Sequence, residues 1–115
     1  MSPRSLQARI DDMLTAATNA QSYVAGMSFE DFSQDLKTIR ATAFEITILG
    51  EAAGHIPPDI RARHPEIPWA LMQRMRNLIA HGYFRIDTLT VWETDQDDLP
   101  HLVLQLQGLR DELAT

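Results

Sequence analysis

The stretch LKTIRATAFEITILGEAAGHI, residues 36–56, decides the fold, because its apolar residues recur at the spacing of an α-helix. One stripe, at intervals of three, four or seven residues, contains Leu36, Ile39, Ala43, Ile46 and Ala53. A second stripe, displaced around the helix, contains Phe44, Ile48, Glu51 and His55. Apolar side chains on two faces indicate a helix that is central or shared with a partner. The small residues Gly50, Ala52, Ala53 and Gly54 would let another backbone come close.

Helical signals continue on the N-terminal side of this stretch. Ser2 can cap a first helix that has Pro3 at its first position, and Gly26 is a plausible stop for it. Ser28 and Asp31 then have the spacing of a helix start. We therefore expect the long central helix to begin at this second start signal.

On the C-terminal side, residues 57–68 hold four prolines, which end the central helix and leave room for one short helix at most. A fourth helix starts near Pro68, and a short amphipathic piece covers residues 87–92. Asp97 or Asp98 then caps a last, leucine-rich helix. Because no segment shows the alternation of a strand, the sequence predicts an all-α fold, a small bundle of four or five helices.

Length and composition exclude several classes of protein. The chain has 115 residues, and we expect one domain over residues 1–115. It contains no cysteine, which excludes disulfides and thiolate metal sites. No apolar run is long enough to cross a membrane, and the N-terminus lacks the apolar region of a signal peptide. These features predict a soluble, cytoplasmic protein.

The charge of the chain is unevenly distributed. The net charge is −6, which argues against a general nucleic-acid coat. Residues 61–85 nevertheless carry five arginines against one glutamate, a local net charge of +4. A basic window inside an acidic protein indicates a focused anion site.

The chemically reactive groups gather in this window. Arg76 and His81 are five residues apart, about 140° around an ideal helix, whereas Asn77 and Arg74 align with His81. Such a set suffices for RNA cleavage without a metal, because the 2′-OH supplies the nucleophile. A histidine can move the protons, and an arginine can stabilise charge on the phosphate. The simpler alternative is that the spacing is a coincidence and that His81 only caps a helix end.

A longer pattern surrounds these residues. The segment Pro65–Trp69, followed by Arg76, Asn77, His81 and Tyr83, resembles the HepT-like HEPN family. Members of that family are toxin ribonucleases of prokaryotic toxin–antitoxin pairs. Their signature places four to six residues between an arginine and a histidine. An asparagine commonly follows the arginine, and a tyrosine stands two residues after the histidine.

The resemblance implies a helical homodimer with two such motifs lining a cleft at its interface, which would resolve the 140° offset. It implies metal-independent cleavage of RNA without a cofactor, with Arg76 and His81 catalytic and with Asn77 and Arg74 as supporting or substrate-contacting groups. It also implies a nucleotidyltransferase antitoxin as partner, which would transfer AMP to Tyr83. The alternative is a non-catalytic helical subunit that binds a nucleotidyltransferase or a nucleotide.

Other polar and aromatic residues have simpler interpretations. His55, His64 and His101 lack metal-ligand spacing, so we expect them on the surface and predict no metal site. Glu51 is expected to be partly buried, either in a salt bridge to an arginine or as a support for the catalytic pair. We expect the large side chains of Trp69 and Trp92 to be anchors in the core or at an interface. Arg61 and Arg63 either extend the basic cleft or solubilise the proline-rich loop.

Overall fold

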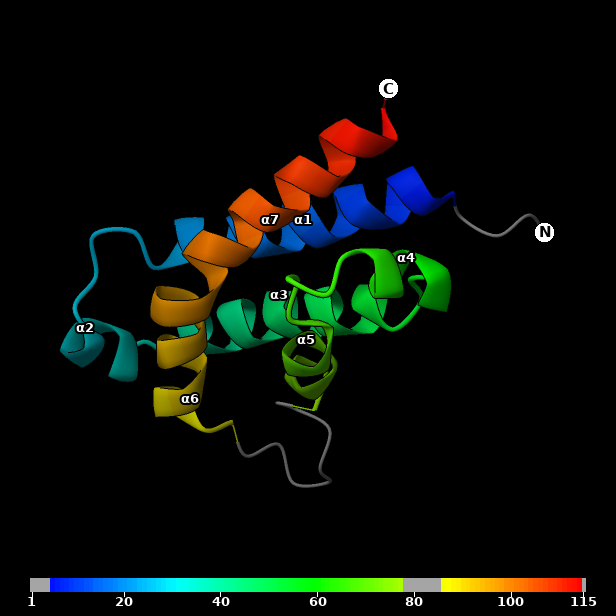
Figure 1. Ribbon diagram of the computed structural model, residues 1–115. Helices are drawn as coiled ribbons and strands as arrows, with labels where there is room; N and C mark the ends of the chain where they lie inside the picture. The colour runs from blue at the N-terminus through cyan, green and yellow to red at the C-terminus, as the bar shows by residue number, and fades with distance from the viewer. Residues whose placement is uncertain (1–4, 78–85, 115) are drawn as a thin grey trace.

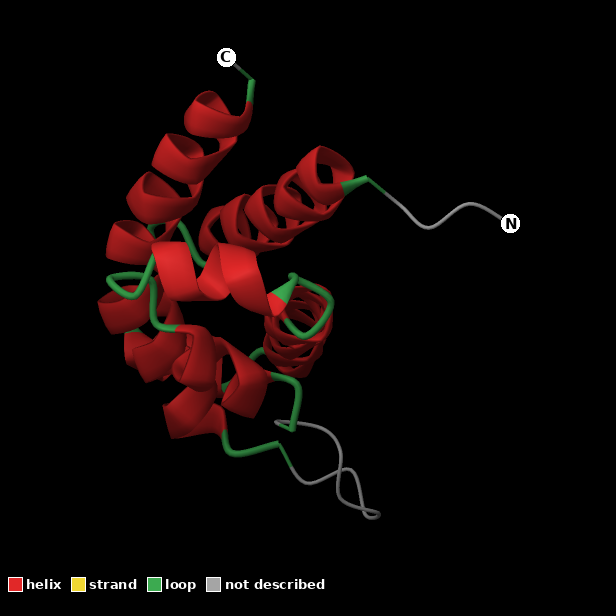
Figure 2. Cartoon of the chain, turned by 45° about the vertical axis from the view of Figure 1, so that its right-hand side comes forward, coloured by secondary structure: helices red, strands yellow, loops and turns green. Residues whose placement is uncertain are grey.

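The computed structural model describes residues 5–77 and 86–114, and within these ranges every regular element is helical (Figures 1 and 2). The elements are α1 (Leu6–Tyr23), α2 (Phe29–Ser33), α3 (Leu36–Ala53), α4 (Pro58–Arg63), α5 (Trp69–Met75), α6 (Thr88–Glu93), a π-helical turn (Thr94–Asp98) and α7 (Leu99–Leu113). The predicted all-α class is confirmed. The described helices outnumber the expected four or five because several of them are short.

Three long helices build the frame. α1 packs along α3 on one side and along α7 on the other, and it runs antiparallel to both (Figure 1). Their facing side chains are fully buried and include Ile10, Met13, Ile46, Leu49, Leu102 and Leu106. Burying one such side chain contributes about 1.5–3 kcal/mol, so this interface is the main source of stability.

α1 begins three residues later than the sequence predicted for a first helix. Ser5 is its N-cap, and the Ser5 hydroxyl accepts the backbone N–H of Ala8 at 3.1 Å. The predicted cap Ser2 and the predicted first residue Pro3 lie outside the described residues. The expected stop is confirmed, because the helix ends just before Gly26, whose φ of 79° suits a residue without a Cβ.

The predicted long helix is divided in two, which corrects the expectation of one helix from Ser28. The capping box of Ser28 and Asp31 is present, but the helix that it starts, α2, ends at Ser33. Asp35 then caps α3, because its carboxylate accepts the N–H of Thr38 at 3.0 Å and the Thr38 hydroxyl at 2.8 Å. With the chain broken here, Phe32 of α2 lies buried in the core, where it packs on Trp92.

The proline-rich stretch holds one short helix, α4, as expected. Ile60 in α4 and Ile67 in the following loop are buried, and these two side chains attach the segment to the core. α5 then crosses α3 near its C-terminal end and buries Met72 and Met75 there. The fourth predicted helix is confirmed up to Met75.

The last helix is not capped by Asp97 or Asp98. α6, the π-helical turn and α7 form one continuous helical run, and Asp98 has helical dihedral angles and no side-chain capping bond. The N–H of Leu99 bonds to the carbonyl of Thr94, five residues back. Pro100 provides a physical reason, because its ring would clash with the carbonyl four residues before it in an α-helix. No helix in the described ranges is both long and apolar enough to span a bilayer.

Candidate functional site

Arg76, the arginine of the predicted catalytic motif, stands directly after α5. It is the C-cap residue of α5, with helical dihedral angles, and it is exposed. No ion pair joins its guanidinium to a carboxylate in the described part of the chain. An exposed arginine can bind an anion through the N–H donors of its guanidinium.

Two glycines set the position of Arg76: Gly50 in α3 and Gly54, the C-cap residue of that helix. A Cβ atom on Gly50 would lie 2.5 Å from the backbone nitrogen of Arg76 and 2.5 Å from the carbonyl oxygen of Met72. Any side chain at residue 50 would therefore push α5 away from α3. A Cβ atom on Gly54 would lie 3.5 Å from Arg76 Nη1, in ordinary contact with the guanidinium. The predicted close approach of a backbone to the small residues is confirmed, and that backbone carries Arg76.

The electrostatic environment of Arg76 comes from the end of α3. The C-terminus of a helix carries a partial negative charge, and the last turn of α3 contains no basic side chain of its own. The Arg76 guanidinium, beside Gly54, supplies a positive charge at that end.

Of the other predicted site residues, the structure describes Arg74 and Asn77. Arg74 is two residues from Arg76 on the opposite side of α5, and its positive charge acts on Asp98. Burial and the neighbouring charge of Asp97 raise the pKa of Asp98, and Arg74 opposes that rise. Asn77 is exposed, next to Arg76. The predicted proton shuttle His81 and the predicted modification site Tyr83 lie outside the described residues.

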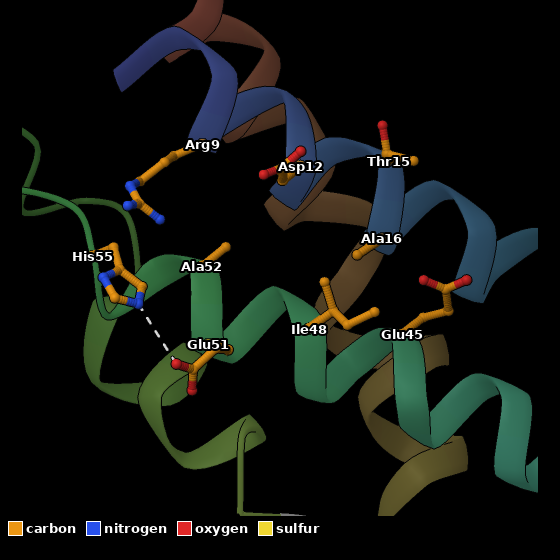
Figure 3. Close-up of a pocket in the computed structure, with 9 residues that line it drawn as sticks. All are labelled: Arg9, Asp12, Thr15, Ala16, Glu45, Ile48, Glu51, Ala52 and His55. Atoms are coloured by element: carbon orange, nitrogen blue, oxygen red, sulfur yellow. Dashed lines mark ion pairs between the residues drawn. The ribbon is translucent and has the colours of Figure 1, made fainter. Parts of the chain in front are cut away.

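A groove between α1 and α3 is lined by three residues of the second stripe, Ile48, Glu51 and His55. It has a volume of about 410 Å³ and a floor of Ala16, Ile48 and Ala52 (Figure 3). Arg9 extends from α1 toward His55, and Glu51 Oε1 lies 3.5 Å from His55 Nε2. The expected burial of Glu51 is wrong, because its side chain is 65% exposed, and its ionic partner is His55, just beyond the end of α3, rather than an arginine.

The charges in this groove disfavour a phosphate. Its lining includes the three acidic residues Asp12, Glu45 and Glu51. Glu45 is already engaged, since its Oε2 accepts the Tyr23 hydroxyl at 2.6 Å and the Asn19 amide at 3.3 Å. The hydrogen bond to Glu45 raises the pKa of the Tyr23 phenol. We therefore do not place the anion site of the basic window in this groove.

The remaining histidines and tryptophans have structural roles. His64 is less exposed than expected, with 14% of its side chain accessible, and it lies between Glu66 and Glu112 at 3.3 and 3.6 Å. His101 is exposed, as expected. Trp92 packs on Phe32 at a centroid distance of 5.2 Å. Across the described ranges, 5–77 and 86–114, no three His, Asp or Glu side chains are grouped to hold a metal ion.

Sequence reasoning missed one feature near Arg76. Trp69 and Gln73 precede Arg76 by seven and three residues, so the three side chains lie within one face of α5. The spacing is visible in the sequence, but only the position of α4 opposite this face makes it a groove.

Comparison with known proteins adds a family to this geometry. The family described as "Ribonuclease HepT-like" matches residues 13–109. A protein of Thermococcus cleftensis named "Probable ribonuclease HepT" is 37% identical over 107 residues, covering 93% of this chain and 97% of that protein. A protein of Methanocaldococcus jannaschii named "Putative RNase MJ0125" is 30% identical over 113 residues, covering 98% and 97%. No solved structure matches the chain.

Proposed function

The chain belongs to the HepT-like ribonuclease family, and from this premise we propose that it is a metal-independent endoribonuclease acting through Arg76 and His81. The observation that carries the proposal is the contact of Gly50 with the backbone of Arg76. A close helix crossing that tolerates no Cβ holds an exposed arginine in a fixed place. Such preorganisation is what stabilisation of a transition-state charge requires.

In the proposed reaction His81 takes the proton of the 2′-OH, and the 2′ oxygen attacks the adjacent phosphorus. The bond to the 5′ oxygen of the next nucleotide breaks, and that oxygen receives a proton from an imidazolium. Arg76 stabilises the negative charge on the phosphoryl oxygens, and Asn77 orients the substrate. The products carry a 2′,3′-cyclic phosphate and a 5′-hydroxyl.

Cleavage of a labelled RNA in the presence of EDTA tests the mechanism. We expect His81→Ala to lower the rate by about 10²–10⁴-fold and Arg76→Ala by about 10²–10³-fold. Arg63→Ala is the matched control, because Arg63 is an exposed arginine of α4 within the same basic window. A rate that depends on added Mg²⁺, or that is unchanged in His81→Ala, would contradict the mechanism. Binding of a nucleotidyltransferase without any cleavage of RNA would favour the alternative function, a non-catalytic helical subunit.

We further propose that the active form is a homodimer that uses the second stripe of α3. Phe44 is 58% exposed and Ile48 is half-buried, so this apolar face is only partly covered by the described residues. Two-fold pairing would bring two copies of the motif together. In light scattering, Phe44→Glu should shift the chain from dimer to monomer. Leu104→Glu is the control, since Leu104 is 66% exposed on α7 and should leave the dimer intact.

We propose that the chain is the toxin of a toxin–antitoxin pair and that its antitoxin is a nucleotidyltransferase. The Tyr83 oxygen would attack the α-phosphate of ATP, with pyrophosphate as the leaving group. The attached AMP would then compete with RNA phosphate for Arg76. Intact mass after co-expression with the neighbouring gene should show AMP on the peptide that contains Tyr83. Tyr83→Phe should remain an active ribonuclease that escapes neutralisation.

A further inference from the structure

A second groove lies between α4 and α5, the helix that precedes Arg76. It has a volume of about 460 Å³ and is open to solvent. α4 contributes Arg61 and Ala62 to its lining, the connecting loop contributes Pro65, and α5 contributes Trp69 and Gln73. None of the described residues that line it is acidic. It therefore differs from the α1–α3 groove, which has three carboxylates in its lining.

The indole of Trp69 is held in place within this groove. Its Nε1–H donates to the backbone carbonyl of His64 at 3.0 Å, and the side chain is half-buried. The ring is therefore oriented before any ligand arrives. An aromatic surface beside a guanidinium and a side-chain amide has the chemistry that receives a nucleobase. The ring stacks on the base, the cation offsets charge, and the amide hydrogen-bonds a base edge.

The motif arginine lies further along the same face of the α5 segment. Gln73, which lines the groove, is four residues beyond Trp69 and three before Arg76, so the three side chains follow one another along this face. At about 1.5 Å per residue, Gln73 is about 4.5 Å and Trp69 about 10 Å along the helix axis from Arg76. A nucleotide chain whose phosphate contacts Arg76 can therefore place a flanking base in the groove.

We propose that the α4–α5 groove is a nucleobase subsite of the RNA substrate. A base stacks on Trp69, Gln73 contacts the edge of that base, and Arg61 attracts the adjacent phosphate. This inference rests on the proposed ribonuclease function and adds a site that fixes which phosphate reaches Arg76. It also assigns Arg61 to the substrate path, the first of the two interpretations that the sequence left open.

Binding can be measured apart from cleavage with an RNA oligomer whose 2′ oxygens are all methylated. Methylation removes the nucleophile, so the oligomer binds without being cut. The same oligomer with an abasic residue at one position in turn keeps every phosphate and removes one base. We expect one position at which loss of the base weakens binding to the full-length protein by roughly 10-fold, the size typical of one stacked base.

Variants then assign that effect to the groove. Gln73→Ala and Arg61→Ala should weaken binding of the complete oligomer, and Trp69→Ala should abolish the difference between the complete and the abasic probe. Arg63→Ala is the control for Arg61→Ala, because it removes the same charge two residues away from outside the groove. If Trp69→Ala fails to fold, quenching of Trp69 fluorescence by the probe, in a Trp92→Phe background, gives the same answer without altering the groove.

The outcomes separate this inference from the proposed function. Base-dependent binding without cleavage of unmodified RNA leaves the subsite standing and refutes the ribonuclease. Cleavage that depends on His81, with equal binding of all abasic probes, overturns the subsite alone. Variants of the groove that bind RNA normally but lose the nucleotidyltransferase would show a protein-docking surface, which also overturns it.

Discussion

The α3–α5 crossing and the π-helical turn differ in what they bury. The crossing buries helix backbone, and the turn buries a carboxyl group. At the crossing, Gly50 lets the backbone of α5 approach α3 closely, and the three atoms nearest to an added Cβ are all backbone. At the turn, Asp95 is only 2% exposed, and its Oδ2 has no hydrogen-bond partner among the described residues. The crossing fixes the backbone of the arginine of the candidate site, whereas the turn buries a carboxylate oxygen at a cost in free energy.

The difference shows which part of the molecule tolerates change. A closely packed crossing should lose stability with any added atom, because the neighbouring atoms are backbone and cannot rotate away. The protein should gain stability when a buried unpaired carboxyl is removed or neutralised. The predictions below test this contrast, from the largest expected effect to the smallest.

Gly50→Ala should have the largest effect. Its Cβ would stand 2.5 Å from two backbone atoms, so α5 must shift, at a cost of about 1–3 kcal/mol in the free energy of unfolding. Urea denaturation measures the cost, and RNA cleavage should fall with it because Arg76 moves. Gly108→Ala is the control, since its Cβ would meet nothing within 4 Å on α7, and it should gain about 0.5–1 kcal/mol. Equal changes in the free energy of unfolding for Gly50→Ala and Gly108→Ala would refute the close crossing of α3 and α5.

Asp95 should make stability depend on pH. Burial raises the pKa of its carboxyl to about 7, above the value of about 3.9 in an unfolded chain. Between these values the folded state binds more protons than the unfolded state. The contribution of Asp95 to stability is therefore full below about pH 4 and is lost as the pH rises through about 7.

Asp95→Asn isolates this contribution, because the amide has nearly the same shape and does not ionise. At pH 8 the variant should be more stable than the parent by about 1–3 kcal/mol, and at pH 4 the difference should be close to zero. Denaturation at a series of pH values measures both limits. A difference that does not change with pH would mean that Asp95 is ionised or neutral in both states.

Asp87 and Asp98 should give the smallest and most selective effect. Asp87 caps α6 by accepting the N–H of Thr90 at 3.1 Å, and this bond lowers the pKa of its carboxyl. Asp87→Ala should cost about 1 kcal/mol at neutral pH, a cost that disappears as the pH falls through the lowered pKa. Asp98→Ala should cost nothing, because Asp98 makes no capping bond. An equal loss of stability in Asp98→Ala would mean that Asp98 caps the last helix, as the sequence predicted.

The sequence predicted the parts of the fold that local signals determine. The stop near Gly26, the capping box at Ser28 and the short helix at 58–63 all follow from residues within a few positions of each other. The break before α3 was missed although Asp35 and Thr38 have cap spacing, because the apolar stripe continues through it. The π-helical turn was missed because its cause, Pro100, also occurs as a normal first-turn residue.

The candidate site was predicted in its residues more than in its geometry. The motif identified Arg76, and the small residues of α3 indicated a close neighbour, but only the fold shows that these two features are in contact. The burial of Glu51 was predicted wrongly because the stripe that contains it lies at the edge of the core, with Ile48 half-buried and Phe44 and Glu51 exposed. Periodicity shows which residues share a face, and it does not show what covers that face.

The five residues Thr94–Asp98 also act as a phase adjustment between two stretches of helix. A π-helical turn holds about one residue more than an α-helical turn, so these five residues cover nearly the angle that four α-helical residues would cover. Deleting one residue here would therefore convert the turn to α-helix and leave α6 facing in nearly its present direction, with Trp92 still against Phe32. When relatives of different length are aligned, a one-residue gap at this point is therefore not a trimmed loop. It records a change from a π-helical to an α-helical turn inside one continuous helical run.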